Sequence, residues 1–146
     1  WLGRISEEEK AERLQQSSLF CAPSLGGESF GIVLLEAMAS KTLVVASDIP
    51  GYSKLTRGGK DALLFKAGDA TVLSKVLTKG LYDSGISQPV VESAFSRVGN
   101  FSMDKLADRY MDVYQRAVTQ KPAVPLAKGG KFFSQRSLTS KNFRIR

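Results

Sequence analysis

Two carboxylates flank a glycine-rich turn and an apolar segment within residues 26–39, which read GGESFGIVLLEAMA. From residue 30 to residue 39 the single polar side chain is Glu36. A helix that is apolar on all sides is a buried helix, and a carboxylate on it is costly unless something pairs with it. Glu36 therefore makes either a structural ion pair or cap, or a ligand contact in a crevice. We favour the ligand contact, because buried charges concentrate at functional sites.

The turn ahead of this segment is suited to an anion. Its glycines allow a ligand to approach the backbone closely. Free N–H groups over residues 30–33, helped by the helix dipole, then form an anion site, at the sheet edge where α/β proteins bind ligands. Glu28 lies just ahead of that site and Glu36 about two turns behind it. A diphosphate there would leave one carboxylate at each end, which suits a nucleotide sugar.

Other catalytic and metal-binding patterns are missing from the sequence. The chain has no histidine, which excludes His-based general bases, Ser-His-Asp triads and histidine metal sites. It contains no G-x-x-x-x-G-K-[ST] loop, no G-x-G-x-x-G turn, and no Asp-x-Asp pair or cysteine cluster for a metal. The single cysteine, Cys21, has no base to activate it. We expect it to be a small buried hydrophobe in a reducing cytosol.

Short apolar runs alternate with helical patterns over residues 1–118. We expect strands at 18–22, 43–46 and 62–65, and residues 1–2 as the end of another strand. Tyr110 and Tyr114 are expected on the core side of the last helix. Strands that alternate with helices predict a parallel, doubly wound, Rossmann-like α/β sheet. The expected helices cover 6–16, 30–40, a short stretch from the turn at 47–51 to 55, one capped by Asp69, 88–99 entered through Pro89, and one capped by Ser102.

Composition and charge divide the chain into a body and a tail. The 146 residues are 42% hydrophobic and 24% charged, as in a soluble globular domain. Residues 1–120 hold 14 acidic and 14 basic residues, so the net charge of +7 belongs to residues 121–146. We expect 1–120 to form the domain and 121–146 a disordered or docking tail. The neutral body argues against nucleic-acid binding, whereas the tail suits an anionic membrane surface.

The spacing from Glu28 to Glu36 resembles the Glu-x7-Glu signature of retaining glycosyltransferases of family 4, which have the GT-B fold. The likeness is closer still to the bacterial phosphatidylinositol mannosyltransferases of that family, on residues 2–5, 21–39 and 44–48. It covers residues 1–118 and is specific at 21–48. The resemblance implies that residues 1–120 are the C-terminal, Rossmann-like half of a GT-B enzyme, which binds the nucleotide sugar and here lacks its first strands.

The same resemblance implies a role for each residue of the site. Glu28, the catalytic residue, would hydrogen-bond the hydroxyls of the donor sugar, and Glu36 would take the ribose hydroxyls. Ile5 would pack on the base, and Lys10 would face the guanine edge with Glu7 nearby. A solvated helix lysine is an equal alternative for Lys10. The donor sugar and diphosphate would be held by Gly27, Phe30, Gly31 and Ile32, the last three through their backbone N–H groups.

The chain departs from that family's pattern in three ways. The basic residues that neutralise the diphosphate lie upstream, on strands absent here. This matters most, because stabilising the leaving group is the main catalytic effect in such chemistry. Ser53 and Lys54 stand where members often carry a glutamate, and Ala62 stands where a glycine is expected.

The resemblance implies retaining transfer of mannose from GDP-mannose to a phosphatidylinositol-type lipid, held by a missing N-terminal domain. It implies a cytoplasmic protein, peripheral to the inner face of the plasma membrane, with no cofactor and no metal required. Two alternatives stay open: a sugar-nucleotide-binding fragment without turnover, and a nucleic-acid-binding module that acts through the tail. The chain starts at Trp1 rather than Met and is interpreted as a piece of a longer protein. An open sheet edge at its first strand would favour self-association.

Overall fold

The computed structural model describes residues 1–119, and the tail expected over 121–146 lies outside the described residues. Contacts between residues divide the chain into one unit, Trp1–Arg109, and a second that begins at Tyr110. Helix α6 (Met103–Thr119) belongs in part to each. All residues of the predicted site lie in the first unit.

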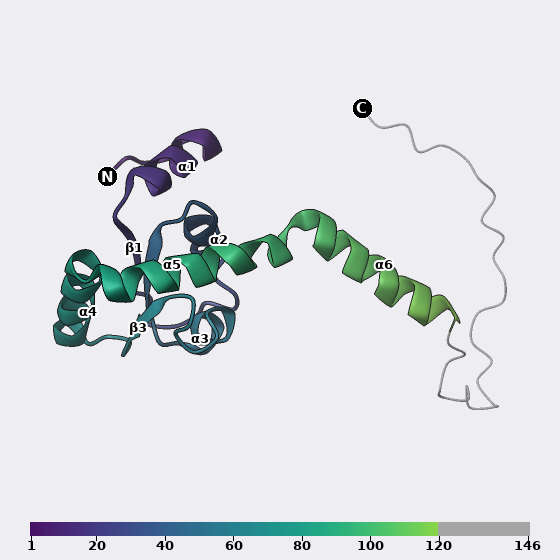
Figure 1. The fold of residues 1–146 in the computed structure, drawn as a ribbon. Coiled ribbons are helices and arrows are strands. Elements are labelled where there is room, and N and C mark those ends of the chain that lie inside the picture. Colours follow the sequence, from purple (N-terminus) through teal and green to yellow (C-terminus); the bar gives the residue numbers. More distant parts are fainter. Residues whose placement is uncertain (120–146) are drawn as a thin grey trace. The chain divides into compact units, whose positions relative to one another are not determined.

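A three-stranded parallel sheet forms the centre of the first unit (Figure 1). Its central strand is buried at every position, which explains the continuous apolar run LVVA in its sequence. The strands are β1 (Leu19–Ala22), β2 (Leu43–Ser47) and β3 (Leu63–Phe65), in the order β1-β2-β3. This arrangement confirms the predicted Rossmann-like α/β class.

Helices connect the strands and cover them. The three predicted caps are present: the Ser6 hydroxyl accepts a hydrogen bond from the Glu9 amide at 3.1 Å, the Asp69 carboxylate accepts one from the Val72 amide at 2.9 Å, and the Ser102 hydroxyl accepts one from the Lys105 amide at 3.4 Å. The remaining helices of the first unit are α1 (Glu7–Gln16), α2 (Ile32–Ala39), α3 (Pro50–Leu55), α4 (Ala70–Tyr82), α5 (Ser84–Val98) and the 3-10 helix η1 (Gly99–Phe101).

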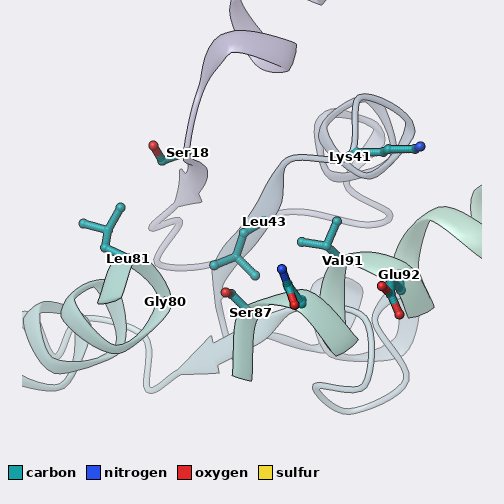
Figure 2. A pocket seen from close by; sticks show the side chains of 9 residues that line it. Ser18, Lys41, Leu43, Gly80, Leu81, Ser87, Val91 and Glu92 are labelled. Carbon is teal, nitrogen blue, oxygen red and sulfur yellow. The ribbon is translucent and has the colours of Figure 1, made fainter. Parts of the chain in front are cut away.

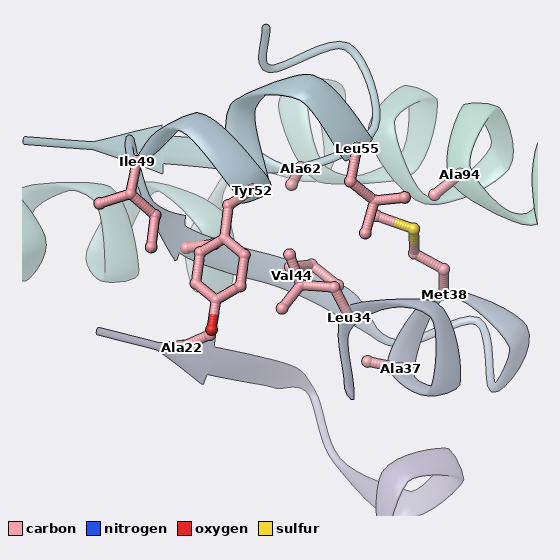
Figure 3. Close-up of a cluster of buried hydrophobic side chains, with 11 residues drawn as sticks. Ala22, Leu34, Ala37, Met38, Val44, Ile49, Tyr52, Leu55, Ala62 and Ala94 are labelled. Carbon is pink, nitrogen blue, oxygen red and sulfur yellow. The ribbon is translucent and has the colours of Figure 1, made fainter. Parts of the chain in front are cut away.

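Both faces of the sheet are covered. On one face Val44 packs with Leu34 of α2 and Tyr52 of α3 in the main apolar cluster (Figure 3). On the other face α4 lies close to the strands through Gly80, where an added Cβ would stand 2.8 Å from a methyl carbon of Leu43. Helices on opposite faces of a parallel sheet make the fold doubly wound.

Two predictions about element boundaries are wrong. Residues 1–2 form no strand, and Trp1 is fully exposed. Among the described strands β1 pairs with β2 alone, so residues 1–2 have no partner strand on the free side of β1. Helix α5 begins at Ser84 rather than at residue 88, so Pro89 lies inside it. The helix starts early because the amides of Ile86 and Ser87 donate to the Asp83 carbonyl and close its first turn ahead of the proline.

One prediction about burial is also corrected. Helix α2 is not buried all round: Ile32 is 65% exposed and Val33 44%, because these residues line an open hollow at the amino end of the helix. Tyr110 and Tyr114 belong to the second unit, and their place on a core face stays a prediction. They contact each other, with ring centroids 6.3 Å apart. Cys21 is half-buried, and its burial raises the pKa of the thiol.

Candidate functional site

The loop over residues 23–31 joins the carboxyl end of β1 to α2 and carries Glu28. It ends at Gly31, the N-cap of α2, which has a left-handed φ of 87°. A Cβ at Gly31 would stand 2.7 Å from the ring of Tyr52, so only glycine fits the conformation and the space. The loop also contains Gly27, with a φ of 82°.

The amino end of α2 opens into a hollow of about 290 Å³. Gly31 offers no side chain to cap the first amides of the helix, so the helix terminus and its dipole are available to an anion. The structure therefore brings together the predicted backbone site and one of the two carboxylates. The hollow is lined by Glu28, Ser29, Phe30, Gly31, Ile32 and Val33.

Glu36, Lys10 and Glu7 meet where α1 contacts α2. The Lys10 ammonium lies 2.8 Å from a carboxylate oxygen of Glu36 and 2.5 Å from one of Glu7. Hydrogen bonds to these two carboxylates raise the pKa of Lys10, and the bond to Glu36 has the larger effect. Lys10 is thus ion-paired rather than simply solvated. The side chains of Lys10 and Glu36 stay 33% and 31% exposed, so both can be reached by a ligand.

Glu36 also lines an apolar groove of about 380 Å³ along the exposed side of α2. Ile32 lines both this groove and the hollow at the helix terminus, so the two spaces adjoin. The order in space is therefore Glu28, the helix terminus, and then Glu36 with Lys10. Ile5 is half-buried just ahead of α1. The groove is completed by Leu35, Ala39, Val98, Gly99, Phe101 and Ser102.

A buried carboxylate outside the predicted site binds side chains in the C-terminal half of α5. Asp61 is fully buried and accepts hydrogen bonds from Arg57 at 2.5 and 2.8 Å, from Ser93 at 2.7 Å and from Arg97 at 2.7 Å. Burial alone would raise the pKa of Asp61. The hydrogen bonds from Arg57 and Ser93 and the charges of both arginines outweigh it and hold that pKa below its usual range.

The departures from the family pattern have distinct surroundings. Lys54 is exposed and lines a cavity of about 210 Å³ with Phe30, Arg97 and other residues. Ala62 is fully buried in the apolar cluster.

A larger cavity, of about 420 Å³, lies at the amino ends of β1 and β2, around Leu43 and Gly80 (Figure 2). None of the predicted site residues lines it.

The described residues contain neither a metal-binding cluster nor a membrane-spanning helix. Among residues 1–119, no group of three or more histidine, cysteine, aspartate and glutamate side chains is placed to hold a metal ion. In the same part of the chain, no helix combines the length and the apolar character that crossing a membrane requires.

Comparison with known protein families shows the class of enzyme to which this domain belongs. Residues 1–96 match the family described as "Glycosyl transferases group 1". The chain belongs to this family. The matched range contains all three strands and every residue of the predicted site.

Among known proteins the chain is similar to mannosyltransferases. It is 35% identical over 127 residues to "Phosphatidyl-myo-inositol mannosyltransferase" of Mycobacterium leprae, covering 87% of this chain and 34% of the relative. The protein of that name from Mycolicibacterium smegmatis is 36% identical, over 79% of this chain and 30% of its own length. "Lipopolysaccharide core biosynthesis mannosyltransferase LpcC" of Rhizobium leguminosarum is 35% identical, over 66% and 28%. The chain thus spans about a third of these curated relatives.

Proposed function

We propose that this chain is the donor-binding half of a retaining mannosyltransferase that uses GDP-mannose. The observation that carries the proposal is the order Glu28, amino end of α2, Glu36 along two adjoining spaces. Glu28 hydrogen-bonds the sugar hydroxyls, and the amides of Phe30, Gly31 and Ile32 hold the sugar and the diphosphate, beside Gly27. Glu36 binds the ribose hydroxyls.

The base is recognised on the side of α1. The Lys10 ammonium donates to the guanine carbonyl, Glu7 holds that ammonium from the other side, and Ile5 packs on the ring. The ion pair between Lys10 and Glu36 joins the base subsite to the ribose subsite. Two relatives from different pathways by name share the word mannosyltransferase, which supports mannose as the donor sugar.

The acceptor belongs to the part of the relatives that this chain does not span. We propose a phosphatidylinositol-type lipid, because several relatives are named phosphatidyl-myo-inositol mannosyltransferases. The reaction breaks the bond from the anomeric carbon to the diphosphate and forms one to an acceptor hydroxyl, with retention. The helix terminus and basic groups stabilise the departing diphosphate, so the proposal requires no metal. It places the enzyme in the cytoplasm, peripheral to the inner face of the plasma membrane.

The experiment is a transfer assay with the full-length protein, GDP-mannose and vesicles that contain phosphatidylinositol. We expect a mannosylated lipid, with competition by added GDP and much weaker competition by UDP. Equal competition by UDP would contradict the guanine and mannose assignments. Binding of GDP-mannose without any transfer would favour a sugar-nucleotide-binding module. A steep salt dependence of DNA binding would favour the nucleic-acid alternative instead.

Replacement of Glu36 tests the ribose subsite. In the full-length protein, Glu36→Ala should weaken GDP binding by about 1.5–3 kcal/mol, the range for hydrogen bonds to a charged group. Calorimetric titration measures this loss. Glu92→Ala, which removes an exposed carboxylate of α5, is the matched control and should bind GDP normally. Unchanged GDP affinity together with a large loss of stability would show that Glu36 is a structural partner of Lys10 alone.

A further inference from the structure

We propose that Tyr52 is a positioning residue that fixes the loop carrying Glu28. The inference rests on the proposed function, in which Glu28 contacts the donor sugar. Tyr52 belongs to α3 and is 2% exposed. Its hydroxyl points from α3 toward the end of β1, where the loop begins (Figure 3).

Tyr52 holds both ends of this loop. Its hydroxyl oxygen lies 3.1 Å from the Ser24 hydroxyl oxygen, two residues after β1 ends. The edge of its ring lies against Gly31, the last residue before α2, closely enough to exclude a Cβ there. One buried side chain therefore sets where the loop leaves the sheet and where it enters the helix. A buried tyrosine hydroxyl normally requires such a partner.

The residue before Tyr52 supports the middle of the loop. The backbone of Glu28 and Ser29 lies directly on Gly51, where an added Cβ would collide with the Glu28 carbonyl. Just before Glu28, Gly26 and Gly27 have no atom within 4 Å of an ideal Cβ position. This part of the loop is thus glycine-rich and faces open space. Gly51 and Tyr52 of α3 therefore support the start, the middle and the end of the loop, beside the edge-to-face contact of Phe30 with Phe101.

Loss of the hydrogen bond between Tyr52 and Ser24 should affect catalysis more than nucleotide binding. Glu36 and Lys10 lie on α2 and α1, outside the loop, so GDP keeps those contacts when the loop loosens. The ring that Tyr52→Phe retains still lies against Gly31, so the amides of Gly31 and Ile32 also keep their places at the diphosphate. Glu28 lies at the centre of the loop and acts on the sugar, where small displacements of a catalytic group lower the rate strongly. A positioning role therefore predicts that kcat and the affinity for GDP respond differently.

The test uses the full-length protein with Tyr52→Phe, Ser24→Ala and the two combined. Tyr52→Phe removes the hydroxyl and keeps the ring against Gly31. We expect kcat to fall about 3- to 10-fold, the range that corresponds to the loss of one hydrogen bond. The Kd of GDP should stay within about twofold of its unmodified value. The combined variant should be no slower than either single variant, because both remove the same bond. Tyr82→Phe, at a residue 84% exposed on α4, is the matched control.

Hydrogen exchange supplies a readout that does not depend on turnover. In Tyr52→Phe the amides of residues 26–30 should exchange about 3- to 10-fold faster, whereas those of β2 keep their protection. If the unmodified protein is active, but Tyr52→Phe leaves kcat or the exchange of the loop amides unchanged, the role of Tyr52 is overturned and the proposed function stands. Additive losses in the combined variant would lead to the same conclusion. An unmodified protein that binds GDP and transfers no sugar would overturn the proposed function and the role of Tyr52 with it.

Discussion

Expressed by itself, the 146-residue chain should transfer no sugar, although it contains both carboxylates and the helix terminus. It spans about a third of the length of its relatives, and we place the acceptor in the remainder. Without a site that orients the attacking hydroxyl, the activation barrier should be about 7–11 kcal/mol higher. The upstream basic residues expected at the diphosphate would be absent as well, which leaves the terminus of α2 as the main counter-charge.

The measurement is mannosyl transfer from GDP-mannose to vesicles that contain phosphatidylinositol, with the full-length protein as the positive control. Sedimentation of the same samples tests a second expectation. Within the described residues β1 pairs only with β2, so its other edge can recruit further chains. The isolated chain should therefore associate unless a partner segment covers that edge. Robust turnover by a monomer would show that other residues carry the chemistry.

Removal of the Asp61 carboxylate should cost the domain about 3–5 kcal/mol of stability, the range for breaking a buried ion pair. Asp61 is fully buried between Arg57 and Arg97. In Asp61→Ala these two guanidinium groups lose their shared partner, and the Ser93 hydroxyl loses its acceptor. Native-state hydrogen exchange of the β2 amides in the full-length protein measures the loss. Asp108→Ala, at an exposed position of α6, should leave that exchange unchanged.

The effect should depend on pH in one direction. The fold lowers the pKa of Asp61, so the stabilisation is complete above the ordinary aspartate pKa and is lost as the pH falls through the lower, folded-state value. The difference between Asp61→Ala and the unmodified protein should therefore shrink in acid. A difference that stays constant down to strongly acidic pH would mean that the carboxylate acts through its shape and packing rather than through its charge.

Local patterns predicted the parts of the site that lie close together in the sequence. Glu28, Gly31 and Glu36 lie on one loop and the helix that follows it, so the glycine spacing and the apolar run of α2 already gave their order. The strand β2 was equally predictable, because burial on both faces leaves an unbroken apolar run. The resemblance to a known family supplied the roles of these residues, which remain predictions.

Contacts between distant segments could not be predicted in this way. The bond between Tyr52 and Ser24 spans 28 residues, and the pairing of Asp61 with Arg97 spans 36. Nothing in the local pattern distinguishes these side chains from ordinary turn and surface residues. The exposed side of α2 was missed for a related reason: a pattern of residue types shows that a helix is apolar, but not which neighbours cover it.

The order of the sheet has a consequence for how this unit folds. Each strand pairs with the next strand along the chain, β1 with β2 and β2 with β3. The contact order of the sheet is therefore low for a parallel arrangement, and the entropy lost in closing each connection is modest. During synthesis β2 can add to β1, and β3 to β2, as soon as each has been made. All strand pairs of the described sheet therefore form within residues 19–65.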